Sequence, residues 1–427
     1  MDYSATLIDS SIFIILITVS LISIFAFIYR NSITSLIDPL LLNGILVCIY
    51  LSGLLGFLNI QNQVAHSTKW VVAGIFIAFL VPSVFVRHVN IKQGTASTST
   101  RITSIFFYAI IGLMIINLIA NYVFGVIPLL SGTQSRGMQG TSLIPTLVLI
   151  SPQLGIIGIC MLAFSNENKF PGKLCVILFI CTMILSGSKS AVIQLLLVFL
   201  FYLYLRRFKC TSINTKTSYK FPKFKIGITI LFCLAVAPIY FSIVVESNVN
   251  TDFFSIFIYR LLAGFDIVFH MANNNIDASL VNSANIFDFY LYPILKLVGF
   301  TPNFQSAGQY VSAEVFGYSD LFESLNPNSN LVVEWIMSFG NISGIIGSIF
   351  CTTAVFNLRK KLLNKRKIRI LDMFLMPQFI LGPFGILLDG SLFMISLIWT
   401  LVIYFFINTF ANILNKSIKS HGRYLLY

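Results

Sequence analysis

The chain has 427 residues, of which 57% are hydrophobic, 14% aromatic and only 10% charged, and its mean hydropathy is +0.88. Charged residues make up about a quarter of a soluble globular protein, so this composition excludes a soluble domain. The net charge of +13 does not indicate nucleic acid as a partner, because the basic residues gather in short segments beside apolar runs, as they do in membrane proteins.

Apolar runs long enough to cross a bilayer recur along the whole chain, and a span needs about 20 such residues. The first, from Ser10 to Tyr29, follows acidic rather than basic residues and precedes no small-residue cleavage site, so we expect a permanent span and not a signal peptide. The other expected spans cover residues 36–58, 70–86, 104–127, 143–164, 172–186, 190–205, 226–245, 329–353, 370–388 and 391–410. The sequence predicts an all-α polytopic integral membrane protein with about eleven transmembrane helices, forming a single transmembrane domain over residues 1–427.

Basic residues predict the orientation. They concentrate after the expected span 190–205, in "RKKLLNKRKIR" at 359–369, and near the C-terminus. Loops rich in Lys and Arg stay in the cytoplasm. Alternation from these loops places the N-terminus outside and the C-terminus inside. Only five of the 28 basic residues then lie on the outer side: Lys69, Arg136, Lys189, Arg260 and Lys296.

One outer loop, residues 246–328 between the expected spans 8 and 9, is far longer than the others. It carries eight acidic and two basic residues, together with apolar stretches such as "IFDFYLYPILKLVGF". A loop of this length is usually functional or disordered, and its aromatic content speaks against disorder. We expect interfacial helices, or helices that dip into the bundle, forming the roof of an outward-facing site for an amphiphilic substrate.

The outer basic residues are candidates for binding an anionic group. The planar fork of Arg matches two phosphate oxygens, which favours Arg136 and Arg260; anchoring to lipid headgroups is the open alternative. The headgroup interpretation is favoured for Lys69 and Lys296. Lys189 lies in "LSGSKSAV", where a turn before the next helix would add backbone N–H groups to an anion site, or is a plain tight turn.

Three titratable residues are candidates for acid–base chemistry. In "GFDIVFHM", Asp266 and His270 are four residues apart and share a helical face, which suits an Asp that orients a His or a local structural contact. Glu334 lies about one turn inside the span that follows the long loop. A carboxylate there is costly unless it is paired or functional, so it either pairs with an outer Arg or acts on an acceptor hydroxyl.

The segment around Glu334, "NPNSNLVVEWIMSFGNISGIIG" at 326–347, has two further features. Its Asn-rich start at 326–330 predicts a turn and a helix start. Its glycines at four- and three-residue spacing predict close helix packing; they are Gly340, Gly344 and Gly347. The chain contains no GxxxxGK[ST], HExxH or GxSxG motif, so we expect no metal or other cofactor and an activated substrate that arrives on the outer side.

These features together resemble the bacterial oligosaccharide repeat-unit polymerases, the O-antigen polymerase (Wzy) family. The resemblance rests on the plan of many spans with one large periplasmic loop and on local motifs. "SGSKSA" at 186–191 is similar to the family's Gly-Ser-Arg-type turn, with Lys189 in place of Arg. "NPNSNLVVEWIMSFGNISG" is similar to its Pro, Glu, Phe-Gly signature, and "SRG" at 135–137 and "YRLL" at 259–262 fit its outer arginines.

The resemblance implies a glycosyltransferase of the bacterial inner membrane that polymerises oligosaccharide repeat units carried on undecaprenyl diphosphate. Arg136, Arg260 and Lys189 would bind the substrate diphosphate, and Glu334, or His270 with Asp266, would act as the base. Expected partners are the lipid-linked oligosaccharides, membrane lipid and a chain-length regulator protein.

Three alternatives stay open. An O-antigen ligase shares the layout but usually carries a His beside an Asn after the large loop, where this chain reads "PNSN". A flippase or other transporter is expected to show inverted repeats and charges at mid-membrane. A structural scaffold leaves the outer arginines and Glu334 without a purpose.

Overall fold

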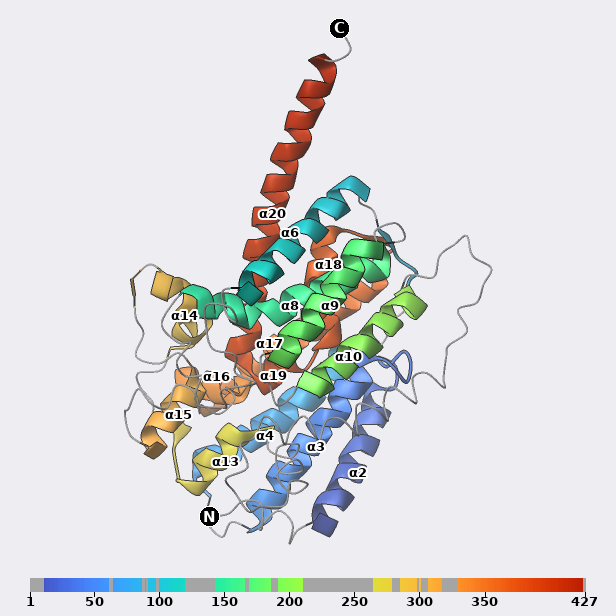
Figure 1. Cartoon of the computed structure of the whole chain (residues 1–427). Helices are drawn as coiled ribbons and strands as arrows, with labels where there is room; N and C mark the ends of the chain where they lie inside the picture. The colour runs from blue at the N-terminus through green and yellow to red at the C-terminus, as the bar shows by residue number, and fades with distance from the viewer. Residues whose placement is uncertain are drawn as a thin grey trace.

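The computed structural model describes residues 11–60, 64–86, 89, 91–96, 100–119, 143–165, 169–185, 191–209, 264–278, 285–297, 299–300, 306–316 and 329–424. These residues are almost entirely helical, as predicted (Figure 1). Within them the strands are β1 (Thr95–Ala96) and β2 (Lys367–Ile368), which pair in parallel with Thr95 opposite Lys367. This short ladder joins two of the loops that the sequence assigns to one side of the membrane.

The helices of the N-terminal half follow the expected spans closely. Helix α8 has the predicted bounds, and α4 ends just before Pro82, which begins α5. The helices are α2 (Ser11–Tyr29), α3 (Pro39–Ile60), α4 (His66–Leu80), α5 (Pro82–Phe85), α6 (Thr100–Leu118), α8 (Leu143–Phe164), α9 (Lys169–Leu185) and α10 (Ala191–Tyr204), which continues as η3 (Leu205–Lys209). Helix α2 packs on α3, and α6, α8 and α9 pack on one another.

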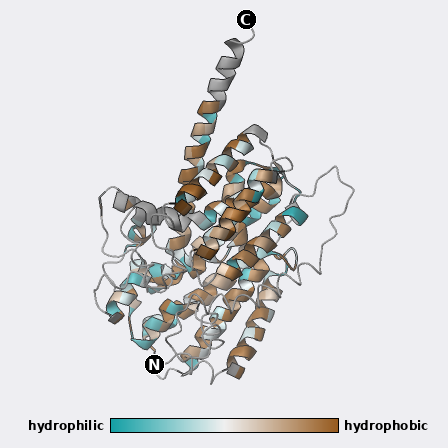
Figure 2. Ribbon diagram, viewed as in Figure 1, coloured by the Kyte–Doolittle hydropathy of each residue, from teal (hydrophilic) through white to brown (hydrophobic). Residues whose placement is uncertain are grey.

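Five helices of the described residues are long and apolar enough to cross a membrane: Ile12–Tyr29, Pro39–Asn59, His66–Phe85, Asn341–Asn364 and Gly390–Leu414. Shorter apolar helices accompany them, and the expected span at 226–245 lies outside the described residues. Large apolar side chains on their outer faces are exposed, with Ile12 at 75% and Phe350 and Phe406 at 73%. Figure 2 shows the hydrophobic colour over most of the bundle. This is the surface of a membrane-embedded protein; eleven spans and the orientation stay predictions.

The expected single span at 329–353 is two helices. Helix α16 (Leu331–Phe339) and α17 (Asn341–Asn364) meet at Gly340, which has a φ of +80°. The two pack against each other so closely that a Cβ on Gly344 would lie 2.6 Å from the backbone nitrogen of Ile336. The glycines therefore do serve close packing, but Gly340 forms the turn. Hydropathy does not detect a break of this kind, because the apolar residues continue through it.

The expected span at 370–388 is also discontinuous. It consists of α18 (Ile370–Met376), η6 (Pro377–Leu381) and α19 (Gly385–Leu388). The backbone stays helical from Met376 into Pro377, and the break comes at Gly382, which leaves the helical conformation just before Pro383, a residue without a backbone N–H. The last helix, α20 (Gly390–Tyr424), has 35 residues and a length of about 50 Å at 1.5 Å per residue. Its C-terminal part projects beyond the rest of the bundle (Figure 1).

The 246–328 segment contains α13 (Asp266–Asn273), α14 (Ile286–Leu297) and α15 (Ala307–Phe316). Helix α13 is inserted among the other helices, where Phe269 packs edge-on against Phe57 of α3 and Phe265 against Tyr50. Helix α14 contacts α16 and α20, and α15 contacts α13 and α16. The expectation that this segment forms helices is confirmed for these three, and their position in the membrane interface or within the bundle stays a prediction.

A buried ion pair links the start of α3 to α17. One Arg359 nitrogen, Nη2, donates to both carboxylate oxygens of Asp38 at 2.7 and 3.0 Å, and these side chains are 1% and 0% exposed. Asp38 also accepts from the backbone N–H of Leu40 and from the N–H and hydroxyl of Thr34. The Thr34 hydroxyl lies 3.0 Å from that of Tyr204 in α10. The pair thus joins three parts of the bundle.

Candidate functional site

Glu334 occupies the first turn of α16, as the sequence predicts. The Asn330 side chain accepts from the N–H of Val332 and so caps the helix, which confirms the predicted helix start. The Asn330 amide also donates to the carbonyl of Leu387 at 2.8 Å. These two bonds fix the start of α16 against the end of α19, and thereby the position of Glu334 one turn later.

The Glu334 side chain is fully buried and points at the beginning of α20. Its Oε1 accepts from the N–H of Ser391 at 2.8 Å. Its other oxygen, Oε2, has no hydrogen-bond partner within the described residues. Gly390 makes the approach possible, because a Cβ there would lie only 2.2 Å from Oε2. Backbone N–H groups at a helix start favour a negative charge, so α20 supplies a partial counter-charge to this carboxyl.

A second carboxyl, Asp389, stands beside Glu334. Its Oδ1 accepts from the N–H of Leu392 at 2.9 Å and from the Ser391 hydroxyl at 3.3 Å. Asp389 is half-buried, whereas Glu334 is completely enclosed. Two carboxyl groups therefore accept hydrogen bonds from the first turn of α20, and both contact Ser391. Of the two, Asp389 is the more exposed on the surface of the protein.

Helices of the 246–328 segment cover this pair. The indole N–H of Trp335 in α16 donates to the Tyr290 hydroxyl in α14 at 3.2 Å. At the other side, the Ser329 hydroxyl accepts from the N–H of Ala307 at the start of α15, and the Ser329 carbonyl accepts from the N–H of Gly390. Helices α14 and α15 thus contact the segment that carries Glu334, and their role as the roof of an outward-facing site stays a prediction.

The enclosure changes the proton affinity of these groups, which lie outside the five long apolar helices. Burial, and then the nearby Asp389 charge, raise the pKa of Glu334 to about 8. Burial also raises the pKa of Asp389. Burial and the nearby Glu334 raise the pKa of the Tyr290 hydroxyl. Glu334 therefore carries a proton at neutral pH, and the pair of carboxyls is able to take up or release one in the physiological range.

Glu334 has no ion-pair partner among the described residues, so its pairing with an outer Arg is not observed there. Arg136, Arg260 and Lys189 lie outside the described residues, and their role in binding a diphosphate stays a prediction. Lys69 is exposed in the first turn of α4, and Lys296 lies in α14.

Asp266 and His270 lie on one face of α13, as predicted, and both are half-buried. The Asp266 carboxylate accepts from the N–H of Ile267 at 3.0 Å, and burial lowers the pKa of His270. Helix α13 packs on α3, α4 and α15, whereas Glu334 faces α20. The three predicted acid–base residues thus lie at two separate positions: Asp266 and His270 in α13, and Glu334 in α16.

Sequence reasoning missed Asp389, Ser391 and Tyr290. "LLDGSLF" at 387–393 carries a signal that was available: an Asp two residues before a Ser at the start of an apolar run is a helix N-cap pattern. No comparable signal points to Tyr290, because its role depends on how α14 packs.

Comparison with family models, with curated proteins and with solved structures finds no match for this chain.

Proposed function

We propose that this protein is a membrane glycosyltransferase that polymerises oligosaccharide repeat units carried on undecaprenyl diphosphate into O-antigen or a similar surface polysaccharide. The observation that carries the proposal is the enclosed carboxyl pair, Glu334 and Asp389, beneath the helices of the 246–328 segment. The family resemblance supplies the substrate class, and the basic residues of the outer side supply the means to hold its diphosphate.

The proposed reaction needs no cofactor, because the substrate is already activated. The hydroxyl oxygen of the acceptor sugar attacks the anomeric carbon of the donor glycan. The bond from that carbon to the diphosphate oxygen breaks, and its electron pair leaves with the diphosphate. Fixed cations at Arg136, Arg260 and Lys189 would stabilise the departing charge, and the hydroxyl proton passes to a carboxylate.

We assign the proton to the Glu334–Asp389 pair rather than to either residue alone. Glu334 is protonated near neutral pH, so the first accepting group is the half-buried Asp389. Glu334 keeps its own proton in its buried position, so no second negative charge repels the Asp389 carboxylate. Asp266 and His270 are the alternative base, since His270 stays neutral near pH 7.

One observation favours a transporter as the second candidate. Helices α16 and α17, and α18, η6 and α19, are discontinuous, and a buried carboxyl lies where two of them meet the start of α20. Broken helices around a buried charge are typical of transporters. An O-antigen ligase is the third candidate, and the structure adds nothing specific in its favour.

The deciding experiment combines the purified full chain, in liposomes, with a lipid-linked repeat unit. A polymerase makes longer lipid-linked glycans and releases undecaprenyl diphosphate. A flippase moves the repeat unit across the membrane without lengthening it, and that result would overturn the proposal. In cells, loss of the gene should remove the polysaccharide ladder while lipid capped with a single repeat remains; loss of all capped lipid contradicts polymerisation.

Variants then test the site. Asp389→Asn preserves the shape and the oxygen that accepts the Leu392 N–H but removes the carboxylate that takes up the proton, so we expect elongation to fall at least 100-fold. Glu314→Gln is the matched control, because Glu314 is exposed on α15 in the same segment. Arg136→Ala and Arg260→Ala should each abolish the ladder in stably inserted protein. Normal polymerisation by both would refute the diphosphate assignment.

A further inference from the structure

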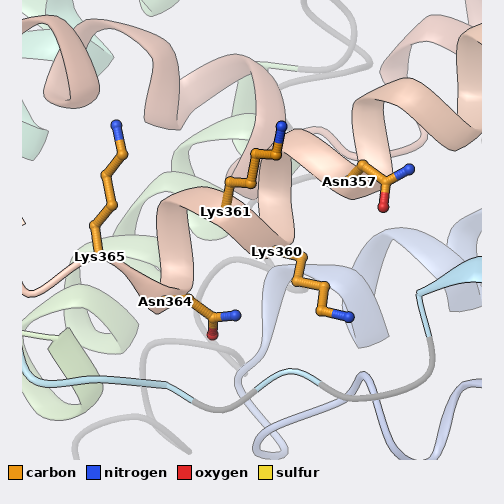
Figure 3. A pocket seen from close by; sticks show the side chains of 5 residues that line it. All are labelled: Asn357, Lys360, Lys361, Asn364 and Lys365. Atoms are coloured by element: carbon orange, nitrogen blue, oxygen red, sulfur yellow. The ribbon is translucent and has the colours of Figure 1, made fainter.

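A basic pocket lies along the last turns of α17, away from the carboxyl pair (Figure 3). Its volume is about 510 Å³, which suits a small polar group. Its lining consists of Asn357, Lys360, Lys361, Asn364 and Lys365. Lys360 follows the first residue of α17 by 19 positions, or about 28 Å along the axis. The pocket is therefore separate from the α16–α17 turn.

The lining residues form two neighbouring rows on one helix face. Asn357, Lys361 and Lys365 follow each other at four-residue intervals, and Lys360 and Asn364 do the same. In Figure 3 the ammonium groups of Lys361 and Lys365 extend to one side of the helix. The ammonium group of Lys360 and the amide of Asn364 extend to the other side. The lining contains three cations and no acidic side chain. Among the described residues, Lys365 alone of these three cations has a counter-ion, Asp372, at 2.5 Å.

An exposed apolar stripe leads along α17 to this pocket. Its residues recur at four-residue intervals and include Ile342, Ile346, Phe350 and Leu358, which are 40 to 73% exposed. From Phe350 to Leu358 the stripe is about 12 Å long, close to the depth of one leaflet of the hydrocarbon core. The stripe ends beside Asn357 and Lys361, so apolar and cationic surfaces are continuous on one side of the helix.

We propose that this part of α17 binds an anionic phospholipid, with the phosphate at the Lys361 ammonium, Lys360 adding positive charge from the neighbouring row, and an acyl chain along the stripe. The Asn364 Oδ1 is buried and accepts no hydrogen bond within the described residues. A phosphate cannot satisfy it, but a headgroup hydroxyl can. Phosphatidylglycerol, which combines a phosphate with two hydroxyls, fits these contacts better than an inorganic anion or a zwitterionic lipid does.

The test is titration of the purified full chain in detergent micelles with phosphatidylglycerol, phosphatidylcholine or inorganic phosphate, with lipid-bound protein counted by native mass spectrometry. We expect saturable binding of phosphatidylglycerol alone. Lys361→Gln, at an exposed position, should weaken it about fivefold, and the double variant Lys360→Gln with Lys361→Gln about 30-fold. Phe350→Gln should weaken lipid binding as well.

Three outcomes would overturn the proposal. The double variant Lys416→Gln with Lys419→Gln removes the same charge from α20, so an equal loss there means unspecific attraction. Equal binding of phosphatidylcholine means that the headgroup charge is not recognised. Binding of inorganic phosphate at the same affinity, unaffected by Phe350→Gln, identifies a free-anion site. None of these outcomes bears on the glycosyltransferase proposal, because the pocket and the carboxyl pair are tested by different variants and readouts.

Discussion

Asp38 and Glu334 are both fully buried carboxyls at the beginning of a helix, yet their surroundings differ. Asp38 accepts from three donors near the start of α3 and forms an ion pair with Arg359. Glu334 accepts the N–H of Ser391 and lies beside the side chains of Ser329 and Ser391, but it has no cation and its Oε2 has no partner in the described part of the chain. The first carboxyl has a counter-ion and hydrogen bonds on both oxygens, and the second has neither a counter-ion nor a partner for Oε2 in the described residues.

This difference separates a structural acid from a reactive one. A buried carboxylate that has a cation and several N–H and O–H donors is stable only in its charged form. A buried carboxyl without a cation holds its proton up to a higher pH and can exchange it. Substitutions should therefore affect folding at Asp38 and chemistry at Glu334.

The largest effect on stability is expected at the ion pair. Asp38→Asn leaves Arg359 buried without a counter-charge, which should cost about 3 to 5 kcal/mol, and Arg359→Met should cost a similar amount. The double variant should recover part of this loss. Heating in detergent with a thiol-reactive dye measures it, because Cys48 and Cys160 are buried and react only after unfolding.

Arg30→Met is the control for that prediction. Arg30 is exposed and lies 4.9 Å from the ring of Phe27, so its loss should cost less than about 1 kcal/mol. If Asp38→Asn is as mild as Arg30→Met, the pair does not hold the bundle together and the contrast with Glu334 fails.

Hydropathy predicted the apolar helices well where the backbone is regular, as in α8, whose interior Pro152 does not break it. It failed at 329–353 and 370–388, because a glycine with positive φ in the first and the Gly382–Pro383 pair in the second interrupt apolar runs without lowering their hydrophobicity. Breaks of this kind depend on backbone conformation, which composition does not report.

The sequence predicted one carboxyl of the candidate site, Glu334, but not the other. Glu334 stood out because a charge within an apolar run is costly. Asp389 lies between two apolar runs, where its sequence pattern indicates a helix N-cap, and only the packing of α16 on α20 shows that it lies beside Glu334. Arg359 was grouped with a basic loop, but it belongs to the buried face of α17, five residues before the helix ends.

The pH dependence of stability is the next prediction. The pKa of Glu334 is raised in the folded protein to about 8, so the folded state binds a proton that the unfolded state has already lost. Stability is then greatest at low pH and decreases as the pH rises to about 8, by at most about 1.4 kcal/mol per pH unit. The lowered pKa of His270 has the opposite effect below about pH 6.5, so the decrease should be clearest between pH 6.5 and 8.

Glu334→Gln should flatten this decrease, and Glu314→Gln should follow the unaltered protein. Midpoints of thermal unfolding at half-unit intervals of pH provide the measurement. An unchanged slope in Glu334→Gln would show that Glu334 is ionised in the folded state and would remove the distinction between the two carboxyls.

Gly390→Ala should disturb the carboxyl pair directly. The new methyl group would lie 2.2 Å from Glu334 Oε2 and 3.0 Å from Leu331 Cδ1, so the side chain or the start of α20 has to move. We expect a cost of about 1 to 3 kcal/mol and a loss of elongation. Gly112→Ala, in α6, meets no atom within 4 Å and should be neutral or slightly stabilising. Equal behaviour of the two variants would contradict the tight contact.

The smallest effect should come from Asn330, which caps α16 and ties it to α19. Asn330→Ala removes both bonds and should lower stability by about 1 to 2 kcal/mol, while Asn330→Asp preserves the cap but not the bond to the Leu387 carbonyl. If the position of Glu334 depends on that second bond, Asn330→Asp will elongate poorly although α16 remains capped. Elongation and unfolding measured on the same preparations separate these effects, since a purely structural role lowers both together, whereas a positioning role lowers elongation first.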